Sequence, residues 1–210
     1  MPILDDLSFE FFSYSAEQTR RLGIHLGGYL RLGDVLCLAG NLGSGKTTLV
    51  QGIGRGWGTL DPVTSPSYVI VNEYRRPDQE RLFHLDAYRL ESAQDAQILD
   101  LDRMLAQGIL VIEWAERIQA ALPAEHLWVQ LEATALENRT MLFSPRGARY
   151  ESMVFNLRRK VYGVFKCYSP LIHQLHGSAW HCLMAHFYGM KSPGKLNIIT
   201  LLSLRRRLSA

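Results

Sequence analysis

The sequence of 210 residues lacks the features of a membrane or secreted protein. Its longest apolar runs are far shorter than the roughly 20 residues that cross a bilayer, and its N-terminus has no basic start followed by an apolar core, as a signal peptide would. Only three cysteines occur, Cys37, Cys167 and Cys182, which suits a reducing compartment. Long-period repeats and low-complexity tracts are absent. We therefore expect a cytoplasmic globular protein that does not associate with a membrane.

Acidic residues are almost absent from the C-terminal part of the chain. Residues 1–150 carry 14 Lys and Arg against 19 Asp and Glu, a net charge of −5, whereas residues 151–210 carry nine against one, a net charge of +8. Such a break in charge indicates a change of organisation near residue 150. We predict one folded domain over residues 1–148 and a basic C-terminal extension of unassigned structure over residues 149–210.

The extension contains two features that invite a functional interpretation. Four histidines and Cys182 fall within residues 173–186, but their spacing matches no zinc pattern, so we expect packing or surface residues. The basic runs at residues 158–160 and 205–207 would suit RNA phosphates. We favour the alternative, a solvated extension.

A phosphate-binding loop is the most specific motif. Residues 40–47 read GNLGSGKT, the pattern G-x-x-x-x-G-K-T. Its glycines allow the chain to curl so that several N–H groups point into one hollow that suits an anion. Lys46 adds a positive charge, and the Thr47 hydroxyl can ligate Mg²⁺. An apolar run before the loop (residues 34–39) reads as a buried strand, and residues 47–57 read as a helix, which is the expected context.

The remaining pattern predicts an α/β fold with three layers around a mixed sheet. Ser15 and Gln18 have capping-box spacing for a helix that runs to about Leu30. Alternation of polar and apolar residues, turn residues and short buried runs predict the other elements. These are a first strand at residues 8–13, a hairpin at 68–86, a helix at 91–108, a strand at 108–114 and a closing hairpin around residues 137–138.

Two acids follow predicted strands and are candidates for metal chemistry. Asp86 follows RLFHL, and Glu113 follows GILVI. Because the carboxyl ends of strands in an α/β sheet lie where the phosphate loop lies, either acid could reach Mg²⁺. No N-K-x-D motif occurs, which disfavours a GTPase, and no L-S-G-G-Q motif occurs, which disfavours a transporter-type ATPase.

Four segments in order resemble the TsaE family, the bacterial ATPase of threonylcarbamoyladenosine synthesis in tRNA. They are GDVLCLAGNLGSGKTTLVQGI, VTSPSYVIVNEY, LFHLDAYRL and GILVIEW, and the match covers about residues 5–145. The resemblance implies a P-loop NTPase fold and a Mg²⁺-dependent ATPase that is weak without its partners. Those partners would be two sugar-kinase-like proteins, one of which transfers the threonylcarbamoyl group to tRNA; tRNA itself would be contacted indirectly.

The resemblance also assigns site residues. It implies ATP phosphate binding by the loop, metal and water contacts for Thr47, Asp86 and Glu113, and catalytic roles for Lys46, Asp86 and Glu113. Trp114 would lie near the base, Thr19 close to the nucleotide and Arg139 near the phosphates. The phosphate-binding residues that the resemblance implies are Gly43, Ser44, Gly45, Lys46, Thr47 and Thr48.

A switch-like loop is implied at Thr64, Ser65 and Ser67, where Ser67 stands in place of the family's usual threonine and keeps a hydroxyl. Asn41 and Ala87 are further departures from the family pattern, since an acid and a bulkier apolar residue are usual there.

Two alternatives stay open from sequence. A small-molecule kinase would need an arginine-bearing lid over the phosphates, for which Arg75, Arg76 and Arg81 are the candidates. A nucleotide-sensing switch would not need the two acids.

Overall fold

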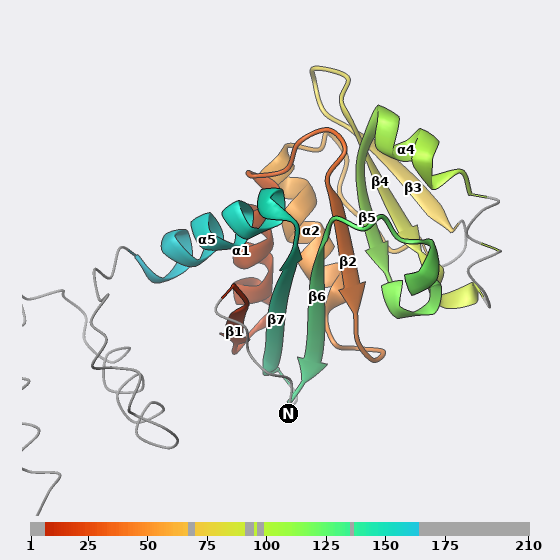
Figure 1. Ribbon diagram of the computed structural model, residues 1–210. Helices are drawn as coiled ribbons and strands as arrows, with labels where there is room; N and C mark the ends of the chain where they lie inside the picture. Colours follow the sequence, from red (N-terminus) through yellow and green to blue (C-terminus); the bar gives the residue numbers. More distant parts are fainter. Residues whose placement is uncertain (1–6, 67–69, 91–94, 96–98, 135–136, 164–210) are drawn as a thin grey trace, which may run out of the picture. The chain divides into compact units, whose positions relative to one another are not determined.

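A computed structural model describes residues 7–66, 70–90, 95, 99–134 and 137–163 of the chain. They form a seven-stranded sheet in the order β1-β7-β6-β2-β5-β4-β3 (Figure 1). The strands are β1 Phe9–Ser13, β2 Val35–Ala39, β3 Val71–Arg75, β4 Arg81–Asp86, β5 Gly108–Glu113, β6 His126–Ala133 and β7 Arg139–Arg146. The helices are α1 Ala16–Gly27, α2 Lys46–Trp57, α4 Leu101–Gln107 and α5 Ala148–Tyr162, with 3₁₀ turns η1 Ala87–Arg89 and η2 Ala115–Ala121.

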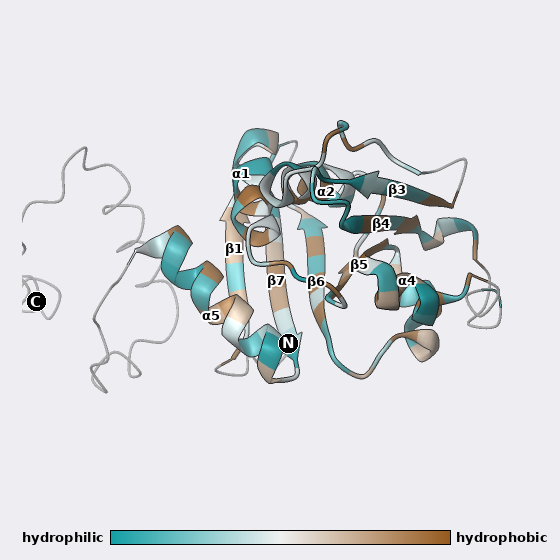
Figure 2. Ribbon diagram, turned by 90° about the horizontal axis from the view of Figure 1, so that it is seen from above, coloured by the Kyte–Doolittle hydropathy of each residue, from teal (hydrophilic) through white to brown (hydrophobic). Residues whose placement is uncertain are grey.

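The sheet is mixed, as the sequence predicts. Strands β4, β5, β2 and β6 run parallel, while β3, β7 and β1 pair antiparallel with their neighbours. One hydrophobic cluster joins one face of the sheet to α1, α2 and α5, and a second joins the other face to α4 and η2. Hydrophilic and hydrophobic residues alternate along α1 and α5, as expected for helices that cover a sheet on one side only (Figure 2). The predicted α/β class is confirmed.

Most predicted elements are found, and one predicted helix is interrupted. Ser15 caps α1 by accepting from the Gln18 N–H at 3.2 Å, and the Gln18 side chain accepts from the Tyr14 N–H at 2.8 Å. The helix predicted over residues 91–108 is interrupted, because Asp95 is helical, residues 99–100 are not, and α4 begins at Leu101. Asp100 has a left-handed conformation (φ 51°) and its side chain caps Arg103 N–H, so the helix cannot extend backwards through it. Residues 91–94 and 96–98 lie outside the described part.

Helices α1 and α2 approach each other through glycines. A Cβ at Gly27 would overlap the Ile53 carbonyl oxygen, and a Cβ at Gly52 would overlap that of Arg20. Gly56 faces the Ile24 carbonyl in the same way. The close contact holds α2, and therefore the loop at its N-terminus, against the rest of the domain.

Helix α5 belongs with the domain, although the sequence-based boundary falls at residue 148. Its residues Tyr150, Met153, Val154 and Leu157 are buried in the same cluster as α1 and α2. The compact unit that contains the sheet takes in α5 as far as Tyr162, so the predicted boundary lies inside it. The rest of the predicted extension, including its histidines and the run 205–207, lies outside the described residues. In the described part, none of the helices has the length and hydropathy that crossing a membrane requires.

Candidate nucleotide-binding site

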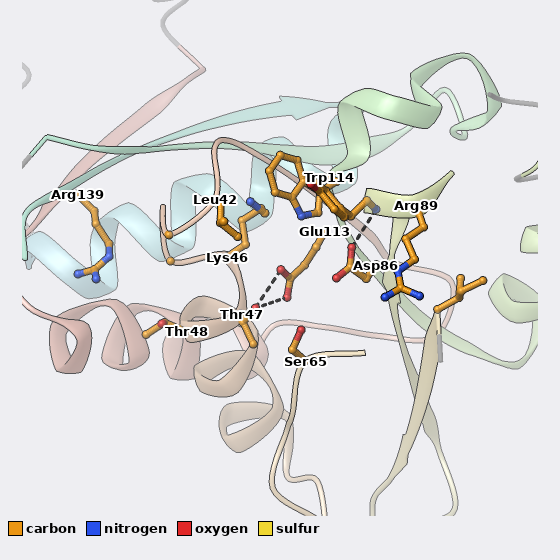
Figure 3. A pocket seen from close by; sticks show the side chains of 14 residues that line it. Leu42, Lys46, Thr47, Thr48, Ser65, Asp86, Arg89, Glu113, Trp114 and Arg139 are labelled. Carbon is orange, nitrogen blue, oxygen red and sulfur yellow. Dashed lines mark hydrogen bonds between the residues drawn. The ribbon is translucent and has the colours of Figure 1, made fainter. Parts of the chain in front are cut away.

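A pocket of about 450 Å³ opens where the parallel strands end (Figure 3). The loop that follows β2 forms one side, and the ends of β4 and β5 form the other, where Asp86 and Glu113 are paired in register. The lining residues are Leu42, Gly43, Gly45, Lys46, Thr47, Thr48, Ser65, Ile70, Asp86, Tyr88, Arg89, Glu113, Trp114 and Arg139. Most of the predicted site residues are therefore brought together.

The loop is shaped by glycines at positions that a side chain would disturb. Gly45 has φ 100° and precedes α2 directly, and a Cβ there would come within 2.8 Å of Arg139 Nε. Arg139 thereby covers the start of α2 from β7. Its Nε is buried without a hydrogen-bond partner among the described residues, and so is Ser44 Oγ in the loop. Unpaired donors beside a helix N-terminus suit an anion.

Lys46 is buried and held at the base of the loop. Its Nζ donates to the carbonyl oxygens of Gly40 at 2.6 Å and Asn41 at 3.1 Å, and it lies 3.7 Å from the centre of the Trp114 ring. Burial lowers the pKa of Lys46, while Glu113 and nearby acids act to raise it. The ammonium is thus a cation whose protein partners are mostly neutral groups, which leaves it able to bind phosphate oxygens.

Glu113 connects the loop helix to the sheet. The Thr47 hydroxyl donates to both carboxylate oxygens, at 2.9 and 3.0 Å, and His84 Nε2 lies 2.8 Å from Oε1. Glu113 is only 3% exposed and His84 is completely buried. A hydroxyl has two lone pairs besides its hydrogen, so Thr47 can give its hydrogen to Glu113 and still offer oxygen to a metal.

The oxygen donors around this point fit Mg²⁺. Asp86 lies beside Glu113 at the end of β4, and one of its carboxylate oxygens accepts from the Tyr88 N–H at 2.9 Å. In the described part of the chain, no cluster of three or more His, Cys, Asp or Glu forms a metal cage. Mg²⁺ does not need one, because it usually takes one or two protein carboxylates together with substrate phosphates and water.

Comparisons with known proteins agree with this geometry. The family model described as "Threonylcarbamoyl adenosine biosynthesis protein TsaE" matches residues 13–141. The chain belongs to the TsaE family.

The match to this chain spans most of the length of each individual relative. A protein of Bacillus subtilis (strain 168) named tRNA threonylcarbamoyladenosine biosynthesis protein TsaE is 35% identical over 144 residues, which is 68% of this chain and 89% of the relative. A protein of the same name from Nostoc sp. is 42% identical over 118 residues, covering 54% of this chain and 72% of the relative. The crystal structure of Bacillus subtilis YdiB superimposes with a TM-score of 0.61 at 31% identity, covering 73% of this chain and 96% of YdiB.

Thr19 and Trp114, which the TsaE resemblance places near the nucleotide, differ in their relation to the pocket. Thr19 is fully buried, its hydroxyl is 2.9 Å from Ser13 Oγ, and it is not part of the pocket lining. Trp114 does line the pocket, in a left-handed conformation (φ 59°), between Lys46 and the Tyr88 ring at 5.0 Å. Its contact is thus with Lys46, and its predicted contact with the base stays a prediction.

The switch-like loop of the TsaE resemblance is described only in part. Ser65 lines the pocket, whereas Thr64 is held through its backbone, which donates to and accepts from the Tyr74 hydroxyl at 3.0 and 3.1 Å. Ser67 lies outside the described residues.

The arginines considered for a kinase lid do not line the pocket. Arg75 and Arg81 are paired with Glu73, and Arg76 is paired with Asp78 and Glu80, all within the β3–β4 hairpin. No observation in the described residues therefore favours the kinase.

Sequence reasoning missed several pocket residues, among them Leu42, Tyr88 and Arg89, and it missed His84 behind the pocket. A signal for His84 exists, because it is a polar residue in the otherwise apolar run LFHL and lies two positions before Asp86, on the same face of β4.

Proposed function

We propose that this chain binds and hydrolyses ATP as an accessory protein for threonylcarbamoyladenosine formation in tRNA next to the anticodon. The proposal rests on one observation: Lys46, Thr47 and Glu113 line the same pocket at the end of a glycine loop, and Thr47 is hydrogen-bonded to Glu113. Membership of the TsaE family supports the pathway, since the relatives' names give tRNA threonylcarbamoyladenosine biosynthesis.

The phosphate-binding step uses groups of the loop, of the start of α2 and of β7. Free N–H groups at the start of α2, the Ser44 hydroxyl and the Arg139 guanidinium would bind phosphate oxygens, with Lys46 beside them. Phosphate oxygens would take over the Lys46 hydrogens that now go to the backbone carbonyls of Gly40 and Asn41.

Hydrolysis requires a water held in line with the terminal phosphorus. The water oxygen bonds to that phosphorus, the bond to the bridging oxygen of ADP breaks, and the water's proton passes to the phosphate product or solvent. Glu113 and Asp86 would hold the water and the metal ligands in place. Thr47 and these acids would hold Mg²⁺, which when bound would supply positive charge against the phosphates.

The partners follow from the same proposal. The hydrolysing chain would act, in the cytoplasm, on the complex of two sugar-kinase-like proteins that transfers the threonylcarbamoyl group, and would reset that complex between rounds. Turnover of ATP would accordingly be slow for the chain alone, and tRNA would be contacted through the complex.

ATP turnover by the purified chain tests the proposal, first alone and then with the two partner proteins and tRNA, with phosphate and ADP both quantified. We expect partners to raise phosphate release, with one phosphate formed per ADP. ADP formed without free phosphate, in the presence of a small metabolite, would instead identify a kinase and overturn the proposal.

A further inference from the structure

We infer that His84 is a positioning residue for Glu113, and that its Nε2–H fixes the carboxylate in the orientation in which Glu113 accepts the Thr47 hydroxyl hydrogen. The inference deepens the proposed ATPase function and rests on it. His84 does not line the pocket, so it would act only through Glu113.

The placement of His84 is unusual for a residue with no contact to a ligand. It lies within β4 with no exposed surface, opposite Val111 of β5 and on the face of the sheet that α2 covers. The strand residues on either side, Phe83 and Leu85, point into the other hydrophobic cluster. A polar ring at such a position is tolerated where it has a polar partner, and the Glu113 carboxylate at 2.8 Å is that partner.

The count of hydrogens decides which way the bond runs. A carboxylate only accepts, so Nε2 must carry the hydrogen and donate it to Oε1. Nδ1 is buried and has no hydrogen-bond partner among the residues that the structure describes. The contact of Nε2 with Glu113 is therefore the hydrogen bond that the described residues give this ring.

The contact with His84 affects the orientation of the Glu113 carboxylate and of the Thr47 hydroxyl. The Glu113 carboxylate accepts hydrogen bonds from Thr47 on the pocket side and from His84 on the sheet side. It is therefore held between two elements, α2 and β4. Without His84 the carboxylate would keep, among the hydrogen bonds that the described residues make, the one from Thr47 and could turn with it. The Thr47 lone pairs and the Glu113 oxygens would then lose the fixed direction that holds a metal ligand or a water for attack.

Substitutions separate positioning from folding. His84→Gln retains an N–H donor, whereas His84→Leu fills similar space without one. His126, also buried and bonded through Nδ1 to the Pro123 carbonyl at 2.7 Å, lies at the start of β6, and His126→Gln serves as the matched control. We expect His84→Leu to lower kcat by about 10- to 100-fold, the usual range for a group that supports a metal or catalytic ligand. The affinity for ATP, measured by calorimetry, should stay within about threefold of wild type.

His84→Gln should recover part of kcat, and His126→Gln should leave kcat unchanged. Because the effect passes through Glu113, His84→Leu should cause little further loss in a Glu113→Gln background. The inference is overturned if folded His84→Leu turns over ATP at the wild-type rate, or if the two losses multiply.

A spectroscopic readout is independent of activity. In the ¹⁵N-labelled full chain, the ring signals of His84, assigned from their loss in His84→Gln, should show the hydrogen on Nε2 in a strong hydrogen bond. Glu113→Gln should shift this signal, and Lys46→Ala should shift it far less. A hydrogen on Nδ1, or a signal insensitive to Glu113→Gln, would contradict the assigned contact.

The two proposals fail in different ways. If wild type hydrolyses ATP and His84→Leu does so equally well, the role of His84 is wrong and the ATPase stands. If wild type neither binds nor hydrolyses ATP with its partners present, the proposed function is wrong, and the catalytic role of His84 falls with it whatever the ring signals show.

Discussion

Lys46 and Glu113 carry opposite charges in the same buried pocket, and they should fail in different ways when replaced. Lys46 is a phosphate ligand in this account, so its loss weakens ground-state binding. Glu113 orders Thr47 and the water, so its loss affects the chemical step.

We therefore expect Lys46→Ala to weaken ATP binding by about 10- to 100-fold, the range for losing a charged hydrogen bond, and to abolish measurable turnover. Glu113→Gln should bind ATP nearly as wild type does but lower kcat by about 100-fold or more. Calorimetry and phosphate release measure the two quantities. Glu80→Gln, which removes an exposed carboxylate of the β3–β4 hairpin, is the control. Normal turnover by Glu113→Gln with partners present would refute its catalytic role.

At the scale of single residues, the motif spacing predicted the loop and both acids because glycine, lysine and strand-end carboxylates have a specific chemistry. His84 escaped prediction because a lone histidine in an apolar strand has no such spacing. Its role depends on register, since β4 places it beside β5 and within reach of Glu113. The tyrosine and arginine of η1 were missed for the same reason.

At the scale of elements, the packing of α1 on α2 sets the position of the loop. Gly27 leaves no room for a methyl group, whereas Gly28, one residue later, has helical angles (φ −66°) and its nearest atoms at 3.6 Å or more.

We expect Gly27→Ala to destabilise the protein by about 1–3 kcal/mol through overpacking, and Gly28→Ala to be neutral or to stabilise by up to about 1 kcal/mol. Chemical denaturation of both variants measures the free energies of unfolding. Equal stability of the two variants would show that the contact between the helices is not tight.

Element types were predictable where a local signal exists, as with the cap at Ser15 or the buried run of β2. The start of α4 was not, since no sequence pattern marked the left-handed conformation of Asp100 that precedes it. The order of strands in the sheet was also beyond the sequence pattern, because pairing across β2 joins segments distant in the chain.

At the scale of the whole molecule, α5 is attached by a polar anchor as well as by its core residues. Arg149 binds the Asp34 carboxylate with two nitrogens, at 2.7 and 3.1 Å, and donates to the Tyr29 carbonyl at 2.7 Å. The Tyr150 hydroxyl accepts from the Val35 N–H at 2.7 Å. The charge pattern did not reveal this helix, because its exposed residues include Arg158, Arg159 and Lys160, which continue the basic composition of the predicted extension.

Shortening the chain tests the attachment. A chain ending at residue 163 should unfold cooperatively, whereas one ending at residue 147 should not. The shorter chain lacks four buried side chains of α5, and burial of each stabilises the fold by about 1.5–3 kcal/mol. Thermal unfolding followed by circular dichroism distinguishes them. A cooperative transition for the shorter chain would support the boundary near residue 148.

Alkaline pH should weaken this attachment through Tyr150. Burial raises the pKa of Tyr150 from 10.0 to about 12. Its neutral form therefore stabilises the fold fully below pH 10, and about 2–3 kcal/mol is lost as the pH rises to 12. Tyr150→Phe should be less stable than wild type at pH 8, since Val35 loses its acceptor, and the difference should shrink above pH 10. Burial also raises the pKa of Cys37 to about 12. Because Cys37 is present in both proteins, its contribution cancels in the difference between them. Urea unfolding measures the stability of both proteins. A stability difference between wild type and Tyr150→Phe that stays the same at every pH would contradict this account.

The central claim is that ATP hydrolysis in this pocket sustains tRNA modification. The most direct measurement counts threonylcarbamoyladenosine formed per partner complex over time, with wild-type chain, with Lys46→Ala and with no added chain. The account predicts many rounds of modification with wild type and about one round in the other two reactions. Equal multiple-round modification in all three reactions would contradict it.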